Sequence, residues 1–292
     1  MALSVWIQAA RPKTLIAAAA PVFVGTGLAA HLAEAVWLPA LAALLGAILI
    51  QIGTNFANDY YDFVRGGDTQ ERVGPVRVTQ AGLLPPAAVK RGMVLVLALA
   101  VLVGVYLVTV GGWLIVWIGT VSVAAAVLYT GGPYPLAYHG LGDVFVFVFF
   151  GLVAVGGTLY VQALSWPLDA WLAGAALGSL STALLVVNNL RDIDTDARAG
   201  KRTLAVRIGP EGTKAEYVAL LLVALAAPAV GVTLLGWPAA ALASLLAVPL
   251  CWSPLRAVFG YREPSELIPA LGATARVTAV YASLLALGLG LG

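Results

Sequence analysis

Long stretches without any charged residue constrain the fold of this chain more than any other feature. No Asp, Glu, Lys or Arg lies between Arg91 and Asp143, and none lies between Glu216 and Arg256. Charged residues make up only 10% of the 292 residues, whereas a soluble domain carries about 25%. The runs are continuously apolar and lack the alternation of barrel strands, so they predict an all-α protein embedded in a lipid bilayer.

The two charge-free stretches are each long enough for two membrane spans of about 20 residues. Gly111-Gly112 divides the first and Gly236-Trp237-Pro238 divides the second, and both sequences are typical of turns. Two further stretches carry one charge near the middle, Glu34 and Asp169 respectively, and also predict double passes. With the apolar C-terminal run, we expect nine transmembrane helices in one bundle, near residues 14–33, 36–57, 92–111, 113–130, 144–163, 168–188, 215–235, 237–254 and 267–291.

Basic residues mark one side of the expected bundle. With a cytoplasmic N-terminus, all 16 Lys and Arg residues fall in or toward cytoplasmic segments, and the charges on the opposite side are Glu34 and Asp169. Cytoplasmic segments of membrane proteins are enriched in Lys and Arg, so the N-terminus is predicted to be cytoplasmic. Residues 1–292 are expected to form a single domain of a multi-pass cell-membrane protein, with cytoplasmic loops at about 59–91 and 189–214. A net charge of +2 gives no reason to expect nucleic acid as a partner.

Two acidic clusters lie where long apolar runs end, and both fall at the predicted cytoplasmic face. One reads Asn58-Asp59-Tyr60-Tyr61-Asp62 and is followed by Asp68, and the other reads Arg191-Asp192-Ile193-Asp194-Thr195-Asp196. Carboxylates at the mouth of a membrane bundle are costly to place there and usually mark a functional site. We therefore expect an active site that opens at the cytoplasmic face.

The spacing within each cluster places oxygen ligands on one helix face. Acids three or four residues apart share a face, and each cluster holds such a pair, preceded four residues earlier by an asparagine. The pairs are Asp59 with Asp62 and Asp192 with Asp196, and the asparagines are Asn55 and Asn188. Oxygen ligands suit Mg²⁺, which binds through few carboxylates and bridges to phosphate oxygens. We expect Mg²⁺, and a diphosphate bound through it, at Asp59, Asp62, Asp68, Asp192 and Asp196, although Asp68 taken alone could equally be a solvated loop residue or a helix cap.

Basic residues in the two loops could neutralise the remaining phosphate charge. Arg65 and Arg72 lie in the first loop, and Lys201 and Arg202 follow Asp196 closely in the second. The enrichment of Lys and Arg on the cytoplasmic side explains the same residues without any ligand. The sequence fits both interpretations.

Four segments, collinear along the chain, resemble the motifs of the UbiA-type intramembrane aromatic prenyltransferases. They are Arg11-Pro12-Lys13-Thr14-Leu15, Asn58-Asp59-Tyr60-Tyr61-Asp62 with Gly67-Asp68-Thr69, Tyr129-Thr130-Gly131-Gly132-Pro133 with Gly140-Leu141-Gly142-Asp143, and Asn188-Asn189-Leu190-Arg191-Asp192 through Asp196 to Gly200-Lys201-Arg202. The Gly-Asp-Thr and Tyr-Thr-Gly-Gly-Pro segments are similar to the branch that prenylates 1,4-dihydroxy-2-naphthoate. One departure concerns Gly66, because the broader family has a further aspartate at that position and here the next acid is Asp68.

The resemblance implies a nine-helix protein that transfers a polyprenyl group from polyprenyl diphosphate to 1,4-dihydroxy-2-naphthoate. Diphosphate and CO₂ would be lost, giving demethylmenaquinone. The resemblance implies as catalytic residues Asp59, Asp62, Asp192 and Asp196, which would hold Mg²⁺, and Asp143, which could act as a base. Metal and basic side chains would stabilise the leaving diphosphate, and an apolar cavity would protect the allylic cation from water.

Candidate substrate-binding residues follow from the same resemblance. Aromatic rings such as Tyr129 and Tyr134 could shield the cation, and His139 stands where the family often has a basic residue. A cationic residue would hold the acceptor carboxylate, with Arg11, Lys13, Arg65 and His139 as candidates. The substrate-binding set is Asn55, Asn58, Arg65, Arg72, Tyr129, Tyr134, His139, Asn188, Lys201 and Arg202.

Other functions fit part of this pattern. The acceptor could instead be 4-hydroxybenzoate or homogentisate. A secondary transporter would also carry intramembrane acids, although here the acids lie at one face rather than at the midplane, and a scaffold without a ligand is a third alternative. Gly174 and Gly178 have the Gly-x-x-x-Gly spacing that lets helices approach closely. That spacing fits packing inside the bundle and a dimer face equally, so the sequence assigns no oligomeric state.

Overall fold

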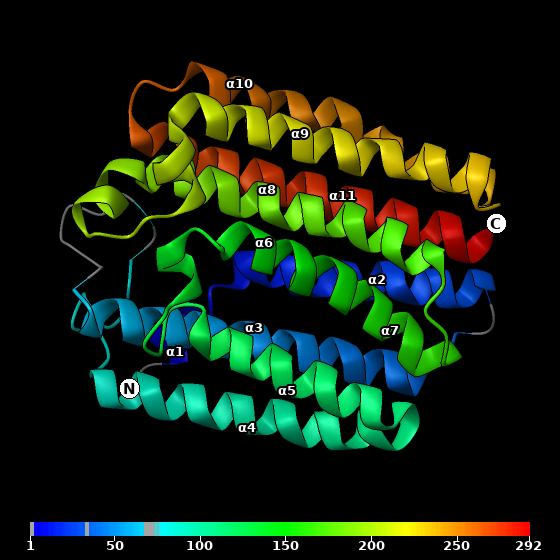
Figure 1. Cartoon of the computed structure of the whole chain (residues 1–292), viewed down its shortest axis with the longest axis horizontal. Coiled ribbons are helices and arrows are strands. Elements are labelled where there is room, and N and C mark those ends of the chain that lie inside the picture. Colours follow the sequence, from blue (N-terminus) through cyan, green and yellow to red (C-terminus); the bar gives the residue numbers. More distant parts are fainter. Residues whose placement is uncertain (1–2, 33–34, 67–73, 75) are drawn as a thin grey trace.

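The computed structural model describes residues 3–32, 35–66, 74 and 76–292. Every regular element among these residues is a helix, and no strand occurs in them. Figure 1 shows the long helices side by side along one axis, with their connections at the two ends of the bundle. The all-α prediction is therefore confirmed, while two predicted site residues, Asp68 and Arg72, lie outside the described residues.

Long single helices form most of the bundle. They are α2 (Leu15–Leu32), α3 (Trp37–Val64), α4 (Pro86–Gly111), α5 (Trp113–Leu128), α8 (Leu168–Arg198), α9 (Leu204–Leu234) and α11 (Leu267–Leu291). Two further passes are built from consecutive elements, which are α6 (Gly142–Phe147), the π-helix η3 (Val148–Val153) and α7 (Ala154–Ala163) in one, and the 3₁₀-helix η4 (Ala239–Cys251) and α10 (Trp252–Gly260) in the other. The short elements are α1 (Leu3–Ala10), η1 (Pro12–Thr14), η2 (Leu136–His139) and η5 (Pro264–Glu266).

Eight helical segments of the described chain are long and apolar enough to cross a membrane. α5, for which the sequence predicts a span over 113–130, is a shorter apolar helix of 16 residues. It packs against α3 and α4 within the bundle (Figure 1). The chain is therefore a multi-pass membrane protein whose described part holds eight such segments and one shorter apolar helix.

α3 and α8 continue beyond the predicted ends of their spans. The spans were expected to end near residues 57 and 188, whereas the helices end at Val64 and Arg198. The acidic clusters therefore lie on the last turns of two helices, and the connections begin later than the predicted loops. The helices are longer than the predicted spans because apolar composition indicates only where the lipid ends. Backbone hydrogen bonds can extend a helix beyond the lipid.

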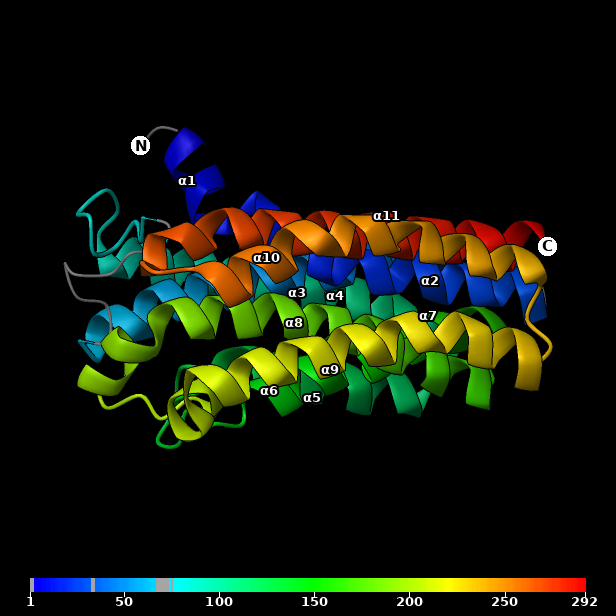
Figure 2. The same ribbon diagram turned by 90° about the horizontal axis from the view of Figure 1, so that it is seen from above.

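The two ends of the bundle carry different connections. Those joining α3 to α4, α5 to α6, α8 to α9 and α10 to α11 gather at one end, on the left in Figure 1. Those joining α2 to α3, α4 to α5, α7 to α8 and α9 to η4 lie at the opposite end. α1 projects from the bundle at the first end, as Figure 2 shows. The C-terminal ends of α3 and α8 lie there too, so the fold brings both acidic clusters to one end.

α8 lies at the centre of the packing and contacts α9, α11, α6 and η3. Its close approach to η3 depends on glycine, because a Cβ on Gly151 would collide with the backbone of Gly174 and Gly178. The Gly-x-x-x-Gly spacing of α8 is thus used inside the bundle, where small residues let two helices approach closely. This spacing gives no indication of a dimer.

Candidate active site

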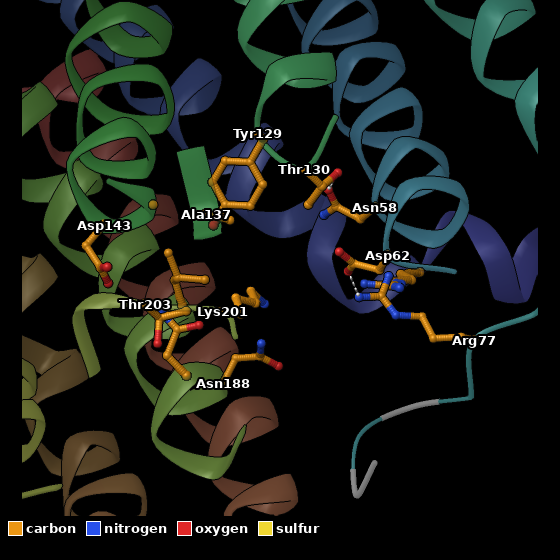
Figure 3. A pocket seen from close by; sticks show the side chains of 14 residues that line it. Asn58, Asp62, Arg77, Tyr129, Thr130, Ala137, Asp143, Asn188, Lys201 and Thr203 are labelled. Atoms are coloured by element: carbon orange, nitrogen blue, oxygen red, sulfur yellow. Dashed lines mark hydrogen bonds and ion pairs between the residues drawn. The ribbon is translucent and has the colours of Figure 1, made fainter. Parts of the chain in front are cut away.

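A small polar pocket lies between the C-terminal ends of α3 and α8. Among the predicted site residues, it is lined by Asn58, Asp62, Tyr129, Asp143, Asn188 and Lys201. Figure 3 shows Asp62 and Arg77 on one side of the pocket and Asp143 and Thr203 on the other. The pocket encloses about 80 Å³, whereas ligand sites usually measure roughly 300 Å³ or more. In this conformation the pocket is therefore smaller than a typical ligand site.

Asp59 anchors the connection between α3 and α4. The residue is buried, and its carboxylate accepts hydrogen bonds from the backbone N–H groups of Val78 (3.1 Å) and Thr79 (3.0 Å). Hydrogen bonds to an ionised acceptor are stronger than those between neutral groups. Asp59 thus holds the chain that returns toward α4 against the end of α3.

Asp62, one turn further along α3, belongs to a buried ion pair. Its Oδ2 accepts from the guanidinium of Arg77 at 3.0 Å, and its Oδ1 accepts from the hydroxyl of Tyr138 at 3.0 Å. The side chains of Asp62 and Arg77 are each 6% exposed. Because removing one partner of such a pair would leave a buried charge without compensation, the pair fixes the position of the segment that carries Arg77.

Among the described residues, the donors to the second acidic cluster lie close to it in sequence. Arg191 donates through Nε and Nη2 to the two carboxylate oxygens of Asp192, at 2.7 Å each. The same guanidinium donates to Oδ1 of Asn188 at 2.7 Å. Asp196 lies 3.4 Å from Nζ of Lys201. In this conformation, protein donors therefore already engage all four helical acids of the two motifs.

No three His, Cys, Asp or Glu side chains among the described residues lie close enough together to hold a metal ion. The acids of α3 and those of α8 are held as two separate pairs, each by its own donors. A metal ion at either pair would therefore share carboxylates that already accept hydrogen bonds or ion pairs from protein donors.

Asp143 is a different kind of acid within the same pocket. It lies in the first turn of α6 and is only 5% exposed. Its Oδ2 is buried and has no hydrogen-bond partner among the described residues. Buried polar atoms are nearly always hydrogen-bonded in the state in which a protein works, so this oxygen is placed to accept a hydrogen bond or a proton from a ligand.

Tyr129 follows the C-terminus of α5 and contributes its hydroxyl to the pocket wall. The absence of a side chain at Gly142 makes room for that hydroxyl, since a Cβ there would lie 2.9 Å from it. Desolvation raises the pKa of the phenol above its usual value, and the carboxylates of Asp143 and Asp62 raise it further. Tyr129 therefore stays neutral and can donate a hydrogen bond to an anionic ligand.

Arg11 is the one candidate for the acceptor carboxylate that lines the pocket; Lys13, Arg65 and His139 do not. It sits between α1 and η1 with a positive φ of 52°, a conformation that costs energy for a residue other than glycine. Asn55 supports this turn, because its Nδ2 donates to the carbonyl of Ala10 at 2.8 Å. Asn55 thus lies behind the pocket, and it positions the segment that carries Arg11.

The remaining predicted residues lie around the pocket rather than in it. Tyr134 is exposed and stacks on His139 with ring centroids 3.5 Å apart. Arg65 is exposed and donates to the carbonyl of Gly132, and Arg202 is exposed as well. These residues therefore do not line the pocket in this conformation.

Sequence reasoning missed three residues that the structure brings to the site. Arg77 pairs with Asp62, Tyr138 donates to the same carboxylate, and Thr203 lines the pocket. Arg77 could have been singled out only as one of several basic residues in its loop. Tyr138 stands beside the predicted His139, but no spacing rule connects a loop tyrosine with an aspartate 76 residues earlier.

Known proteins are similar to this chain over nearly its whole length. A family model described as the UbiA prenyltransferase family matches residues 18–275. The 1,4-dihydroxy-2-naphthoate octaprenyltransferase of Mycobacterium tuberculosis is 44% identical over 95% of this chain and 94% of its own length, and that of Escherichia coli is 39% identical over 93% and 90%. A UbiA homologue from Aeropyrum pernix has the same fold, with a TM-score of 0.74 at 15% identity over 94% of this chain and 97% of its own. A homologue from Archaeoglobus fulgidus, solved with DMAPP and Mg²⁺, gives 0.65 at 14% identity over 96% and 98%.

Proposed function

The chain belongs to the UbiA prenyltransferase family, and on that premise we propose that it transfers a polyprenyl group from polyprenyl diphosphate to 1,4-dihydroxy-2-naphthoate. The reaction releases diphosphate and CO₂ and gives demethylmenaquinone once the hydroquinone ring is oxidised. The observation that carries this proposal is the near-full-length similarity to bacterial 1,4-dihydroxy-2-naphthoate octaprenyltransferases. The enzyme acts within the cell membrane, because its substrate tail and its own helices are both apolar.

The finer architecture we propose is a nine-helix bundle, with α5 as its shortest span and a cytoplasmic N-terminus. The connections at the end that holds the acidic clusters carry basic residues such as Arg77 and Lys201, whereas those at the opposite end carry no Lys or Arg. Basic segments favour the cytoplasmic side. The pocket would then open toward the cytoplasm, where the water-soluble diphosphate product can leave.

Mg²⁺ is the cofactor that suits the acids of α3 and α8. The residues proposed to hold it are Asp59, Asp62, Asp192 and Asp196, with Asp68 as a further candidate. All four helical acids are buried carboxylates, and hard oxygen donors on two facing helix ends match the preference of this ion. When bound, Mg²⁺ would neutralise diphosphate charge as the C–O bond breaks.

Basic residues of the connections would bind the diphosphate directly. Arg77 and Lys201 line the pocket and at present pair with Asp62 and Asp196. A phosphate oxygen can replace a carboxylate oxygen as the partner of either cation without loss of charge pairing. The outer basic residues proposed to join them are Arg65, Arg72 and Arg202.

The acceptor would bind on the side of the pocket formed by Asp143. Arg11 would hold its carboxylate, and Tyr129 would donate a hydrogen bond to an oxygen on the ring. Oδ2 of Asp143 would accept the proton of a ring hydroxyl, which raises electron density at the ring carbon that attacks. Asn58 and Asn188, whose side chains also line the pocket, would orient the two substrates.

Bond changes in this reaction balance without a nucleophilic side chain. The C–O bond of the allylic diphosphate breaks, and a ring carbon of the acceptor forms a C–C bond with the released allylic carbon. The carboxylate then leaves as CO₂, and its electron pair restores the aromatic ring. The protein's contribution is to hold both substrates in line and to exclude water from the allylic cation.

An acceptor panel tests the proposed function. Membranes that contain the protein are incubated with a labelled polyprenyl diphosphate and, separately, with 1,4-dihydroxy-2-naphthoate, 4-hydroxybenzoate or homogentisate. We expect a prenylated product only with the naphthoate, at the mass that corresponds to CO₂ loss. Preferential prenylation of another acceptor would reassign the substrate within the same chemistry.

A further inference from the structure

The side chain of Tyr138 contacts an acid of the first motif and a basic residue beside each of the two motifs. Its hydroxyl donates to Oδ1 of Asp62 on α3 at 3.0 Å. Its ring lies within cation–π range of two basic groups, with Cζ of Arg65 at 5.8 Å and Nζ of Lys201 at 5.7 Å from the ring centroid. Arg65 directly follows α3, and Lys201 follows α8 and pairs with Asp196.

The backbone around Tyr138 is tied to the same two places. Its carbonyl accepts from the backbone N–H of Arg202 at 3.0 Å, and the next carbonyl, of His139, accepts from Nη2 of Arg207 at 2.8 Å. On the α3 side, the hydroxyl of Thr130 donates to Oδ1 of Asn58 at 2.9 Å. Hydrogen bonds therefore link the segment 130–139 both to the end of α3 and to the residues that follow α8.

We propose that Tyr138 is a positioning residue that orients Asp62 and sets the separation between the two acidic motifs. This proposal rests on the proposed function, because it takes Asp62 as a ligand of the bound metal. With Oδ1 held by Tyr138, the carboxylate of Asp62 keeps one orientation and presents Oδ2 when Arg77 moves away. The ring keeps Lys201 beside the pocket when Lys201 exchanges Asp196 for a phosphate oxygen.

Two substitutions at Tyr138 distinguish the role of its hydroxyl from the role of its ring. Tyr138→Phe removes the hydroxyl that donates to Asp62 and keeps the ring and both cation contacts. Tyr138→Leu removes the ring as well. Tyr261→Phe is the matched control, because the ring of Tyr261 also lies near a lysine, at 5.5 Å from Nζ of Lys214, and Tyr261 does not line the pocket.

The experiment measures Mg²⁺ binding with the full-length protein in lipid nanodiscs. Inorganic pyrophosphate is the probe, and the rise in melting temperature with Mg²⁺ concentration gives an apparent Mg²⁺ affinity. For Tyr138→Phe we expect an affinity about tenfold weaker than wild type, since outer partners of metal ligands typically contribute 10- to 100-fold. Tyr138→Leu should in addition raise the KM for polyprenyl diphosphate more than the KM for the naphthoate, and Tyr261→Phe should match wild type in both measurements.

Two results would overturn the role of Tyr138. One is an apparent Mg²⁺ affinity of Tyr138→Phe within twofold of wild type. The other is an equal loss in melting temperature with and without Mg²⁺, which would indicate a purely structural residue. Failure of the proposed function looks different, because Mg²⁺ and pyrophosphate would then fail to stabilise the wild-type protein itself.

Discussion

The two acidic motifs have similar spacing, yet the protein neutralises them in different ways. On α3, the donors to Asp59 and Asp62 come from 15 to 76 residues away along the chain. On α8, the donors found among the described residues are near neighbours, Arg191 beside Asp192 and Lys201 five residues after Asp196. The α3 motif therefore depends on how the connections dock, whereas the α8 motif is organised largely by its own sequence.

This difference indicates which side of the site has to move. The pocket is smaller than a typical ligand site, so we expect a connection around it to open when the substrates bind. Lifting the segment that carries Arg77, Val78 and Thr79 would expose the carboxylates of α3 but leave the pairing of Asp192 with Arg191 intact. We expect the α8 motif to serve as the fixed part of the site and the α3 motif to be completed when the connections close.

The largest expected effect comes from removing one acid from each motif. Asp59→Ala and Asp192→Ala should each lower Mg²⁺-dependent prenyl transfer by about 1000-fold, since each removes charge that stabilises the leaving diphosphate. Both variants should still insert, which the membrane fraction reports. Asp59→Ala alone should also speed hydrogen exchange at the amides of Val78 and Thr79. Near-normal turnover of either variant, with exposed Asp194→Ala as the matched control, would remove the proposed metal site.

Breaking the buried ion pair of the α3 motif should have the next largest effect. Arg77→Met leaves Asp62 buried without its cation, so we expect about 3 kcal/mol of lost stability and faster hydrogen exchange across residues 76–84. The double variant Asp62→Asn with Arg77→Met should recover part of that loss, which a double-mutant cycle measures. Additive losses would show that the pair does not hold the connection.

A smaller and more selective effect is expected at the α8 motif. Lys201→Ala should raise the KM for polyprenyl diphosphate about tenfold, the size of one charge-assisted hydrogen bond, and should change the KM for the naphthoate by less than about twofold. Steady-state kinetics with each substrate varied in turn distinguishes the two. A phosphate role for Lys201 is contradicted if both constants rise equally.

The smallest effect on activity is expected at the opposite end of the bundle. There Nε1 of Trp237 donates to Oδ1 of Asp169 at 2.7 Å, and both residues are buried. Trp237→Phe should cost about 1–3 kcal/mol of stability, because the carboxylate loses its partner, while the turnover per folded molecule stays within about twofold of wild type. A large loss of turnover at unchanged melting temperature would show that the two ends are coupled.

The sequence predicts well what depends on local spacing and composition. Apolar runs located the helices, and the distribution of acids and bases placed both motifs at one end. Asp62, Asp143 and Lys201 were predicted as site residues, and all three line the pocket. The motif of Asp192 could be interpreted almost completely, because its partner Arg191 is adjacent.

What the sequence misses depends on contacts between distant segments. Asn55 shares its helix face with Asp59, yet its side chain donates hydrogen bonds to Ala10 and Thr14 and does not line the pocket. Tyr138 reaches Asp62 because the connection after α5 is hydrogen-bonded both to the end of α3 and to the segment that follows α8. Helical spacing carries no information about such contacts, so these roles become visible only in three dimensions.

We propose that the two unequal acidic motifs act together as one metal-dependent prenyl transfer site. The most direct test measures CO₂ release and prenylated product together, using the purified protein, polyprenyl diphosphate and carboxyl-labelled 1,4-dihydroxy-2-naphthoate, with and without Mg²⁺. We predict equal amounts of CO₂ and product when Mg²⁺ is present, and neither when it is chelated. Product that retains the carboxylate, or product formed without a divalent metal, would contradict this account.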